Sequence, residues 1–221
     1  MKKTIFFIAL LITTSVNGQL NNSLLLSGGS NGFGFSIQRQ TSAKFAFGVS
    51  GNSLNASTKL FHYFAGKIIK TKAITNSLQA EAFVKWFPMG QDYFGDYERN
   101  RLFVRAGAAF REDPTYLGST SFWDKFEFGD FVLTDDQIGS VNMKITTNKI
   151  QPFAGVGYNI INSYRFAVSA EAGSFYHGTP SMKVTATGIL QSNEMNEARL
   201  NEIVSTVKFL PYLRLEAGIK F

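Results

Sequence analysis

The segment FLPYLRLEAGIKF (residues 209–221) alternates strictly between two kinds of side chain. Apolar residues occupy every second position from Leu213 to Phe221, and arginine, glutamate, glycine and lysine stand between them. Successive side chains of a β-strand point to opposite faces. The pattern therefore predicts a strand with one apolar face and one face that carries charges, ending on an aromatic residue.

The same two-sided alternation recurs along the chain and predicts an all-β fold. An aromatic content of 14% together with 20 Gly favours strands and turns over helices. Eight strands are expected, most of them long enough to cross a bilayer at a tilt, which takes about 9–11 residues. They cover residues 31–40, 43–51, 57–70, 77–88, 101–111, 150–160, 164–177 and 209–221. A ten-stranded alternative adds segments 141–147 and 180–187.

One segment has a helical period instead. Apolar residues from Leu200 to Val207 recur at helical spacing, and Ser192 or Asn193 can serve as the N-cap. We predict one short helix within 191–207, before the last strand. Its apolar stripe needs cover, which a barrel mouth would provide.

The second face of the strands distinguishes a membrane barrel from a soluble sheet. A solvated sheet face usually carries a varied polar mixture, whereas here glycine, small residues and isolated charges dominate. Side chains just fill the interior of an eight-stranded barrel, and ions enclosed there must be paired. We therefore expect an eight-stranded antiparallel transmembrane β-barrel in which glycines make room for long charged side chains. A soluble secreted β-sandwich with a solvated charged face is the alternative.

The expected lumenal charge network draws on several strands. Its members are Glu81, Lys85, Arg101, Arg105, Arg165, Glu171, Arg214, Glu216 and Lys220.

The first residues have the order of a secretory signal. Lys2 and Lys3 precede an apolar run from Ile5 to Ile12, and small residues follow up to Gly18. The run is shorter than the roughly 20 residues of a spanning helix. We expect residues 1–18 to be a cleaved signal peptide and residues 19–221 to form one barrel domain. The chain has no Cys, so disulfides and thiolate metal sites are not available.

Four segments carry a resemblance to known proteins: VKWFPMG, RLFVRAGAAF, IQPFAGVGYN and VKFLPYLRLEAGIKF. With the terminal Phe, they resemble small Gram-negative outer-membrane β-barrels of the OmpA/OmpX/OmpW type, including a family of uncharacterised bacterial barrels. The resemblance implies insertion into the cell outer membrane by the barrel-assembly machinery, which reads a C-terminal signal. The signal would comprise Tyr212, Leu215, Ala217, Ile219 and Phe221. With the C-terminus in the periplasm, the long insertions 112–149 and 178–208 would lie outside the cell.

Catalytic chemistry finds little support in the sequence. The two histidines are His62 and His177. Glu171, Ser174 and His177 stand close in sequence, but strand alternation sends Ser174 to the other face, so a triad cannot form. We expect no catalytic residue, no cofactor and no metal site. A net charge of +6 is too mild to indicate nucleic acid as a partner.

An acidic, Phe-rich stretch within 112–149 is the one further candidate. Its carboxylates are Asp124, Glu127, Asp130, Asp135 and Asp136. We expect a solvated loop; a Ca²⁺ site, or contact of its aromatic residues with lipopolysaccharide or a partner protein, are alternatives.

These observations predict a non-enzymatic outer-membrane barrel with a structural or surface-interaction role and a lumen plugged by side chains. Its expected partners are outer-membrane lipid, lipopolysaccharide and the assembly machinery. The alternatives are a narrow pore or a carrier of a small hydrophobic molecule and, less favoured, a lipid-modifying enzyme.

Overall fold

The structure is a computed structural model that describes residues 22–221 except 65–66, 90–101, 123–125, 129–130, 134, 164 and 192–196. Within these limits side chains are described except at 62–64, 67, 122, 126–128, 131–133 and 135–136.

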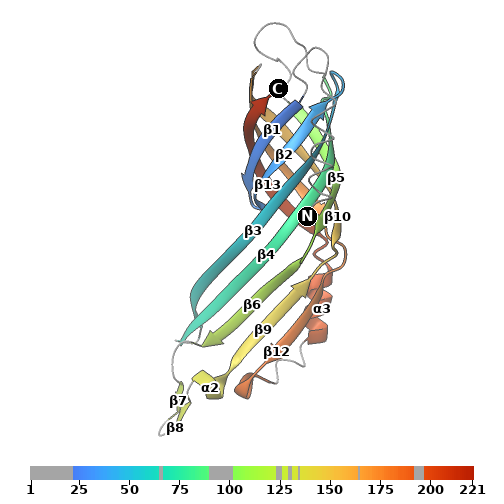
Figure 1. The fold of residues 1–221 in the computed structure, drawn as a ribbon. Helices are drawn as coiled ribbons and strands as arrows, with labels where there is room; N and C mark the ends of the chain where they lie inside the picture. Colours follow the sequence, from blue (N-terminus) through green and yellow to red (C-terminus); the bar gives the residue numbers. More distant parts are fainter. Residues whose placement is uncertain are drawn as a thin grey trace, which may run out of the picture.

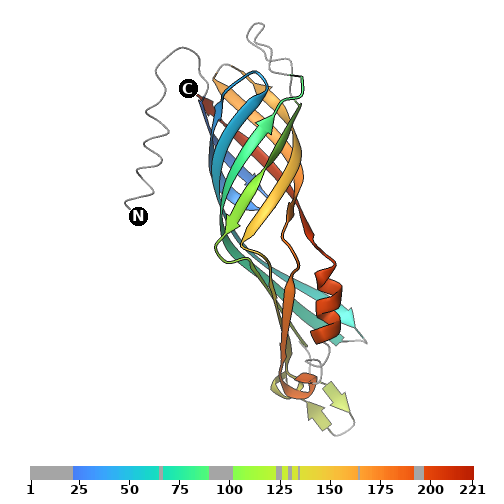
Figure 2. The ribbon, with the colours of Figure 1, turned by 90° about the vertical axis from the view of Figure 1, so that its right-hand side faces the viewer.

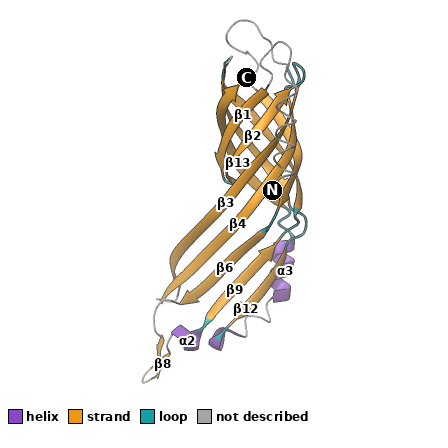
Figure 3. Ribbon diagram, viewed as in Figure 1, coloured by secondary structure: helices purple, strands orange, loops and turns teal. Residues whose placement is uncertain are grey.

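Strands dominate the described residues, and the helices lie along the part of the sheet beyond the barrel (Figure 3). The elements in chain order are β1 (Asn22–Gly29), β2 (Gly32–Gln40), β3 (Phe45–Phe64), β4 (Lys67–Trp86), β5 (Leu102–Arg111), β6 (Thr115–Phe122), β7 (Phe126–Phe128), β8 (Phe131–Leu133), α2 (Asp135–Ile138), β9 (Ser140–Thr146), β10 (Ile150–Asn162), β11 (Phe166–Tyr176), β12 (Ser181–Ala186), α3 (Glu197–Ser205) and β13 (Phe209–Lys220).

One antiparallel sheet of eleven strands has the order β12-β9-β6-β4-β3-β2-β1-β13-β11-β10-β5. A further pairing of β4 with β5 closes the sheet on itself, so the strands from β4 round to β5 form a barrel (Figure 1). β1 pairs with β13, from Ser23 opposite Lys220 to Gly29 opposite Arg214. Closure leaves no free sheet edge in this part of the chain.

Beyond the barrel the sheet continues as an open extension. The extension consists of the distal halves of β3 and β4 together with β6, β9 and β12. Figure 2 shows the barrel and the extension end to end, with the C-terminus at the barrel end that faces away from the extension. β7 and β8 form a separate hairpin.

The strand boundaries differ from expectation in two places. Residues 22–29 form β1, which was not predicted because the consecutive leucines Leu24 to Leu26 hide the period of two. In the barrel Leu25 is 2% exposed, while Leu26 is 71% exposed on the outer face. The predicted strand 57–70 is not a separate strand, since its halves belong to β3 and β4.

The expected count of eight or ten strands is therefore not confirmed, because the sheet formed by the described residues has eleven. The two segments of the ten-stranded alternative are strands, β9 and β12, but they lie in the extension and not in the barrel. The long insertions thus add strands to the sheet beyond the barrel end.

The predicted short helix before the last strand is confirmed as α3. The apolar stripe of α3 led us to expect this helix at the barrel mouth. Instead, α3 lies against β12 in the extension (Figure 1). The Asn201 side chain pairs with both backbone groups of Met182, and Glu197 accepts a hydrogen bond from the Val184 N–H at 2.9 Å. Side chains of α3 thereby satisfy backbone groups of the edge strand, which would otherwise be open to pairing.

Candidate functional site: the barrel lumen

The strand alternation determines what fills the lumen. On β13 the inward residues Tyr212, Arg214 and Glu216 are at most 3% exposed, whereas Leu213 and Leu215 are 66% and 60% exposed on the outer surface. The inner face therefore carries the charges, and the outer face is apolar.

Arg105 of β5 lies at the centre of the enclosed charges. Its Nη1 donates to Glu216 Oε1 at 2.8 Å and to Glu171 Oε2 at 3.3 Å. Its Nη2 donates to Glu81 Oε2 at 2.9 Å. One guanidinium group, fully buried, thus joins carboxylates from three different strands.

Two further cations complete what we call the lumenal network, formed by Glu81, Lys85, Arg105, Glu171, Arg214 and Glu216. Lys85 Nζ lies 2.7 Å from Glu216 Oε2, and Arg214 Nη1 donates to Glu81 Oε2 at 2.8 Å. All six side chains are at most 4% exposed. Within the network three cations face three carboxylates, so the charges of these six residues cancel, as buried ions require. Arg111 is a further buried cation, 2% exposed; it lies outside the network and donates to the Tyr116 hydroxyl at 2.7 Å.

Neutral polar groups donate further hydrogen bonds to the carboxylates. Ser50, directly opposite Glu81 in the β3–β4 register, donates to its Oε2 at 2.8 Å. Asn52 and Gln79 donate to Oε1 of the same carboxylate, and the Tyr212 hydroxyl donates to Glu171. We did not predict these partners, although strand alternation already placed Gln79 and Tyr212 on the charged face.

Aromatic side chains bracket the network along the barrel axis. Phe83, Phe153, Phe175 and Tyr212 pack together with Ala109 towards the extension, and Phe87, Phe103 and Ala46 pack towards the other end. The Arg105 guanidinium lies 3.6 Å from the centre of the Phe83 ring, and Lys85 Nζ lies 4.7 Å from that of Phe103. These cation–π contacts fill the space around the ions.

Inward glycines accommodate these rings. A Cβ on Gly157 would lie 2.1 Å from Phe103 Cζ, and a Cβ on Gly48 would lie 2.4 Å from Phe83 Cζ. We expected lumenal glycines to make room for charged side chains; at these two positions they make room for aromatic rings.

Two of the residues predicted for the network are not among its members in the structure, and a third falls outside the described residues. Arg165 is exposed in the turn between β10 and β11, because β11 starts only at Phe166. Lys220 is half-buried on the inward side at the end of β13. Arg101 lies outside the described residues.

The residues predicted as a C-terminal signal occupy both faces of β13. Leu215, Ala217, Ile219 and Phe221 are exposed on the outer surface, whereas Tyr212 is 3% exposed in the lumen. Tyr212 therefore does not share a surface with the other four.

The catalytic candidates do not come together in a triad. Glu171 belongs to the lumenal network, and Ser174 lies on the opposite side of β11 by strand alternation. The side chains of His62 and of the acidic stretch, Asp124, Glu127, Asp130, Asp135 and Asp136, lie outside the described part of the structure.

Among the described residues, no group of three or more His, Cys, Asp or Glu side chains could hold a metal ion. None of the helices described is long and apolar enough to cross a membrane.

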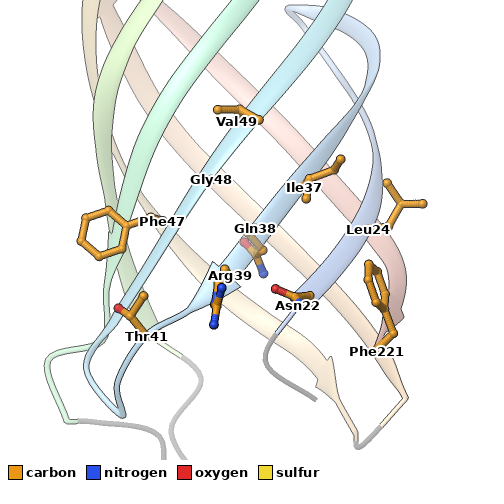
Figure 4. A pocket seen from close by; sticks show the side chains of 10 residues that line it. All are labelled: Asn22, Leu24, Ile37, Gln38, Arg39, Thr41, Phe47, Gly48, Val49 and Phe221. Atoms are coloured by element: carbon orange, nitrogen blue, oxygen red, sulfur yellow. The ribbon is translucent and has the colours of Figure 1, made fainter. Parts of the chain in front are cut away.

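A groove lies on the outer surface near the C-terminus (Figure 4). It has a volume of about 420 Å³, and its apolar lining comes from Leu24, Ile37, Phe47, Val49 and Phe221. Asn22, Arg39 and Thr41 line its end nearest the turn after β2.

Comparison with known proteins shows the fold. No protein-family model matches the chain, and no curated protein matches it. It is similar to the crystal structures of CarO and CarO2 from Acinetobacter baumannii, each with a TM-score of 0.66. Identity is 19% to CarO and 17% to CarO2, and each comparison covers 93% of this chain and 100% of the other. The chain thus shares their all-β antiparallel fold over nearly its full length.

Proposed function

We propose that the chain is a non-enzymatic β-barrel of the Gram-negative outer membrane, with a structural or surface-interaction role and a lumen closed by side chains. One observation carries the proposal: the closed barrel is apolar outside and holds a charge-balanced network inside. A closed barrel satisfies all backbone hydrogen bonds without water, so it is the form of sheet that can span a bilayer.

The outer surface supports a lipid environment. Phe33, Ile150 and Leu213 are 79%, 66% and 66% exposed on three separate strands. A monomeric soluble protein rarely exposes apolar side chains over so large a continuous surface. In a bilayer the same side chains contact acyl chains, so they are not exposed to water.

We take the closed ring of β1–β5, β10, β11 and β13 to be an eight-stranded membrane barrel of the OmpA/OmpX/OmpW type. In this proposal residues 1–18 direct export, and the assembly machinery reads Phe221 with its outward neighbours on β13. The extension then projects from the outer surface of the cell, where it can contact lipopolysaccharide or other molecules.

Fractionation of the expressing cells tests the proposal. We expect the protein in the outer-membrane fraction, extracted only by detergent, with a gel mobility that changes on boiling as folded barrels melt. Recovery in the soluble periplasmic fraction, with the same mobility before and after boiling, would contradict it.

A second candidate function is transport or carriage of a small hydrophobic molecule, favoured by the outer groove near Phe221. Its lining of Leu24, Ile37 and Val49 fits an alkyl chain, with Arg39 at one end. Displacement of a fluorescent fatty acid from the purified protein, lost in a Val49→Trp variant, would support this alternative. The plugged lumen predicts no steady ion conductance in planar bilayers, and stable open-channel steps would favour a pore.

A further inference from the structure

One face of the extension carries an unusual concentration of positive charge. In the strand register Lys59, Lys72, Ser119, Asn142 and Thr185 form one row across five strands. Along each strand successive side chains point to opposite faces. The side chains of every second row therefore lie on the same face as this row. The face, which we call the lysine face, contains five lysines: Lys59, Lys70, Lys72, Lys144 and Lys183.

Like charges lie directly opposite one another on this face. Lys59 pairs with Lys72, and Lys144 pairs with Lys183, as cross-strand neighbours. Such pairs destabilise a sheet. Along the registered rows of this face no Asp or Glu occurs among the described residues. The lumenal network contains a carboxylate for each cation, whereas the described part of the lysine face contains none, so folding of this part gives no reason for its composition.

The lysine face is open and contains a groove of about 540 Å³. Lys72, Lys144 and Lys183 surround it, and Ser119 and Asn142 lie between them. Burial on β12 alternates: Met182, Val184 and Ala186 are at most 8% exposed on the face towards α3, while Lys183 is exposed on the other. The helix α3 therefore leaves the lysine face uncovered.

The spacing of the amines limits what can bind. Lys144 and Lys183 stand on adjacent strands, and Lys72 stands two strands from Lys144. Strands are about 4.8 Å apart, so the amines can reach anionic groups separated by about 10 Å. The hydroxyl and amide of Ser119 and Asn142 suit sugar hydroxyls, and the apolar side chains of Ile74 and Leu117 beside them suit the faces of sugar rings.

We propose that the lysine face binds a phosphorylated glycan, through ion pairs from Lys72, Lys144 and Lys183 to phosphate groups on neighbouring sugars. The glycan can be the sugar part of lipopolysaccharide in the same membrane or a free acidic polysaccharide. The proposal rests on the proposed function in one respect, the exposure of the extension outside the cell. Binding by the purified protein does not depend on that orientation.

Calorimetric titration of the full chain in detergent at low salt tests the proposal. The probe is the phosphorylated core oligosaccharide released from lipopolysaccharide by mild acid. We expect K72Q/K144Q/K183Q to weaken binding about tenfold or more, since each exposed ion pair contributes modestly. The control K44Q/K149Q/K208Q removes the same charge from exposed positions elsewhere and should bind as the parent does.

Loss of binding after enzymatic dephosphorylation of the oligosaccharide supports the proposal, as does equal binding of intact lipopolysaccharide and of the oligosaccharide. Unchanged affinity of the lysine variant, or no binding by the parent, overturns it. The proposal is also overturned if intact lipopolysaccharide binds the lysine variant and the control variant equally while the oligosaccharide does not bind. The binding site is then the apolar outer surface of the barrel.

Two further measurements show whether a loss of affinity in the lysine variant comes from misfolding or from the loss of an oligomer. The gel mobility shift on boiling shows whether the lysine variant is folded, and K183E, a single exposed change, provides a second variant that should also lose affinity. If sedimentation shows that the lysine variant instead dissociates an oligomer of the parent, the face binds a second copy and the glycan proposal is overturned. Failure of the fractionation test would leave the binding result standing.

Discussion

At the scale of single residues, the lumen depends on charge balance. Glu81 accepts hydrogen bonds from Arg105, Arg214, Ser50, Asn52 and Gln79. A buried cation that loses its partner costs far more than an intact pair contributes. The network is therefore sensitive to the removal of any one charge.

Glu81→Gln keeps the shape of the side chain and leaves the lumenal network with one excess positive charge. We expect the free energy of unfolding, measured with urea in detergent, to fall by about 3–5 kcal/mol. The exposed Glu112→Gln is the control and should change little. Glu81→Gln/Arg214→Gln restores the balance and should recover part of the loss. Equal free energies of unfolding for Glu81→Gln and Glu112→Gln would contradict the account.

The lumenal glycines give a second prediction at this scale. Gly157→Ala would place a Cβ 2.1 Å from Phe103, while Gly51→Ala on the outer face would meet Phe35 only at 3.8 Å. We expect Gly157→Ala to lower the free energy of unfolding by about 1–3 kcal/mol through overpacking. Gly51→Ala should be neutral or slightly stabilising. Equal urea midpoints for Gly157→Ala and Gly51→Ala would contradict this prediction, because the lumen would then have room for a methyl group at Gly157.

At the scale of elements, α3 protects the edge of the extension. Asn201 pairs with the N–H and the C=O of Met182 in the outermost strand, β12. We expect Asn201→Ala to speed hydrogen exchange of the Met182 amide about fivefold, since one hydrogen bond contributes about 1 kcal/mol. Amides in the barrel strands should not change.

The exposed Glu202→Ala on the same helix is the matched control. Exchange at Met182 that is equally fast in both variants would mean that the helix as a whole, and not the Asn201 side chain, covers the edge.

Sequence alternation predicts the elements best where one face is apolar and the other is enclosed. On β4 the pattern placed Glu81, Phe83 and Lys85 together on one side, and the structure puts all three in the lumen. The prediction extended β11 too far towards its start, because Ser163 closes the turn by accepting a hydrogen bond from the Phe166 N–H at 3.0 Å. Arg165 thus belongs to the turn.

The extension could not be predicted in the same way. Its strands β9 and β12 alternate, as in SMKVTA of β12, but the alternation alone assigned them to a larger barrel and did not show that they lie beyond it. β6 (TYLGSTSF) has polar residues on both faces, so its sequence gives only a weak strand pattern. Residues 57–70 lack a clean period because they combine the ends of two strands with the link between them. The order of the strands follows from long-range pairing, which no local pattern contains.

At the scale of the whole molecule, the barrel and the extension have different surfaces. The barrel is apolar outside and ionic inside, and the extension carries lysines on an open face. The central claim is that the outer face of the barrel contacts lipid. The absence of Cys allows a single spin label to be placed on that face without background.

Collision accessibility of such labels in lipid vesicles tests this claim most directly. The labels are placed by Ala106→Cys, Val156→Cys and Leu215→Cys on three barrel strands, and by Thr185→Cys on the exposed lysine face. We predict that the three barrel labels collide with oxygen dissolved in the bilayer and not with a water-soluble nickel chelate, and that the Thr185→Cys label does the reverse. Barrel labels as accessible to the nickel chelate as the label on the extension would contradict the account.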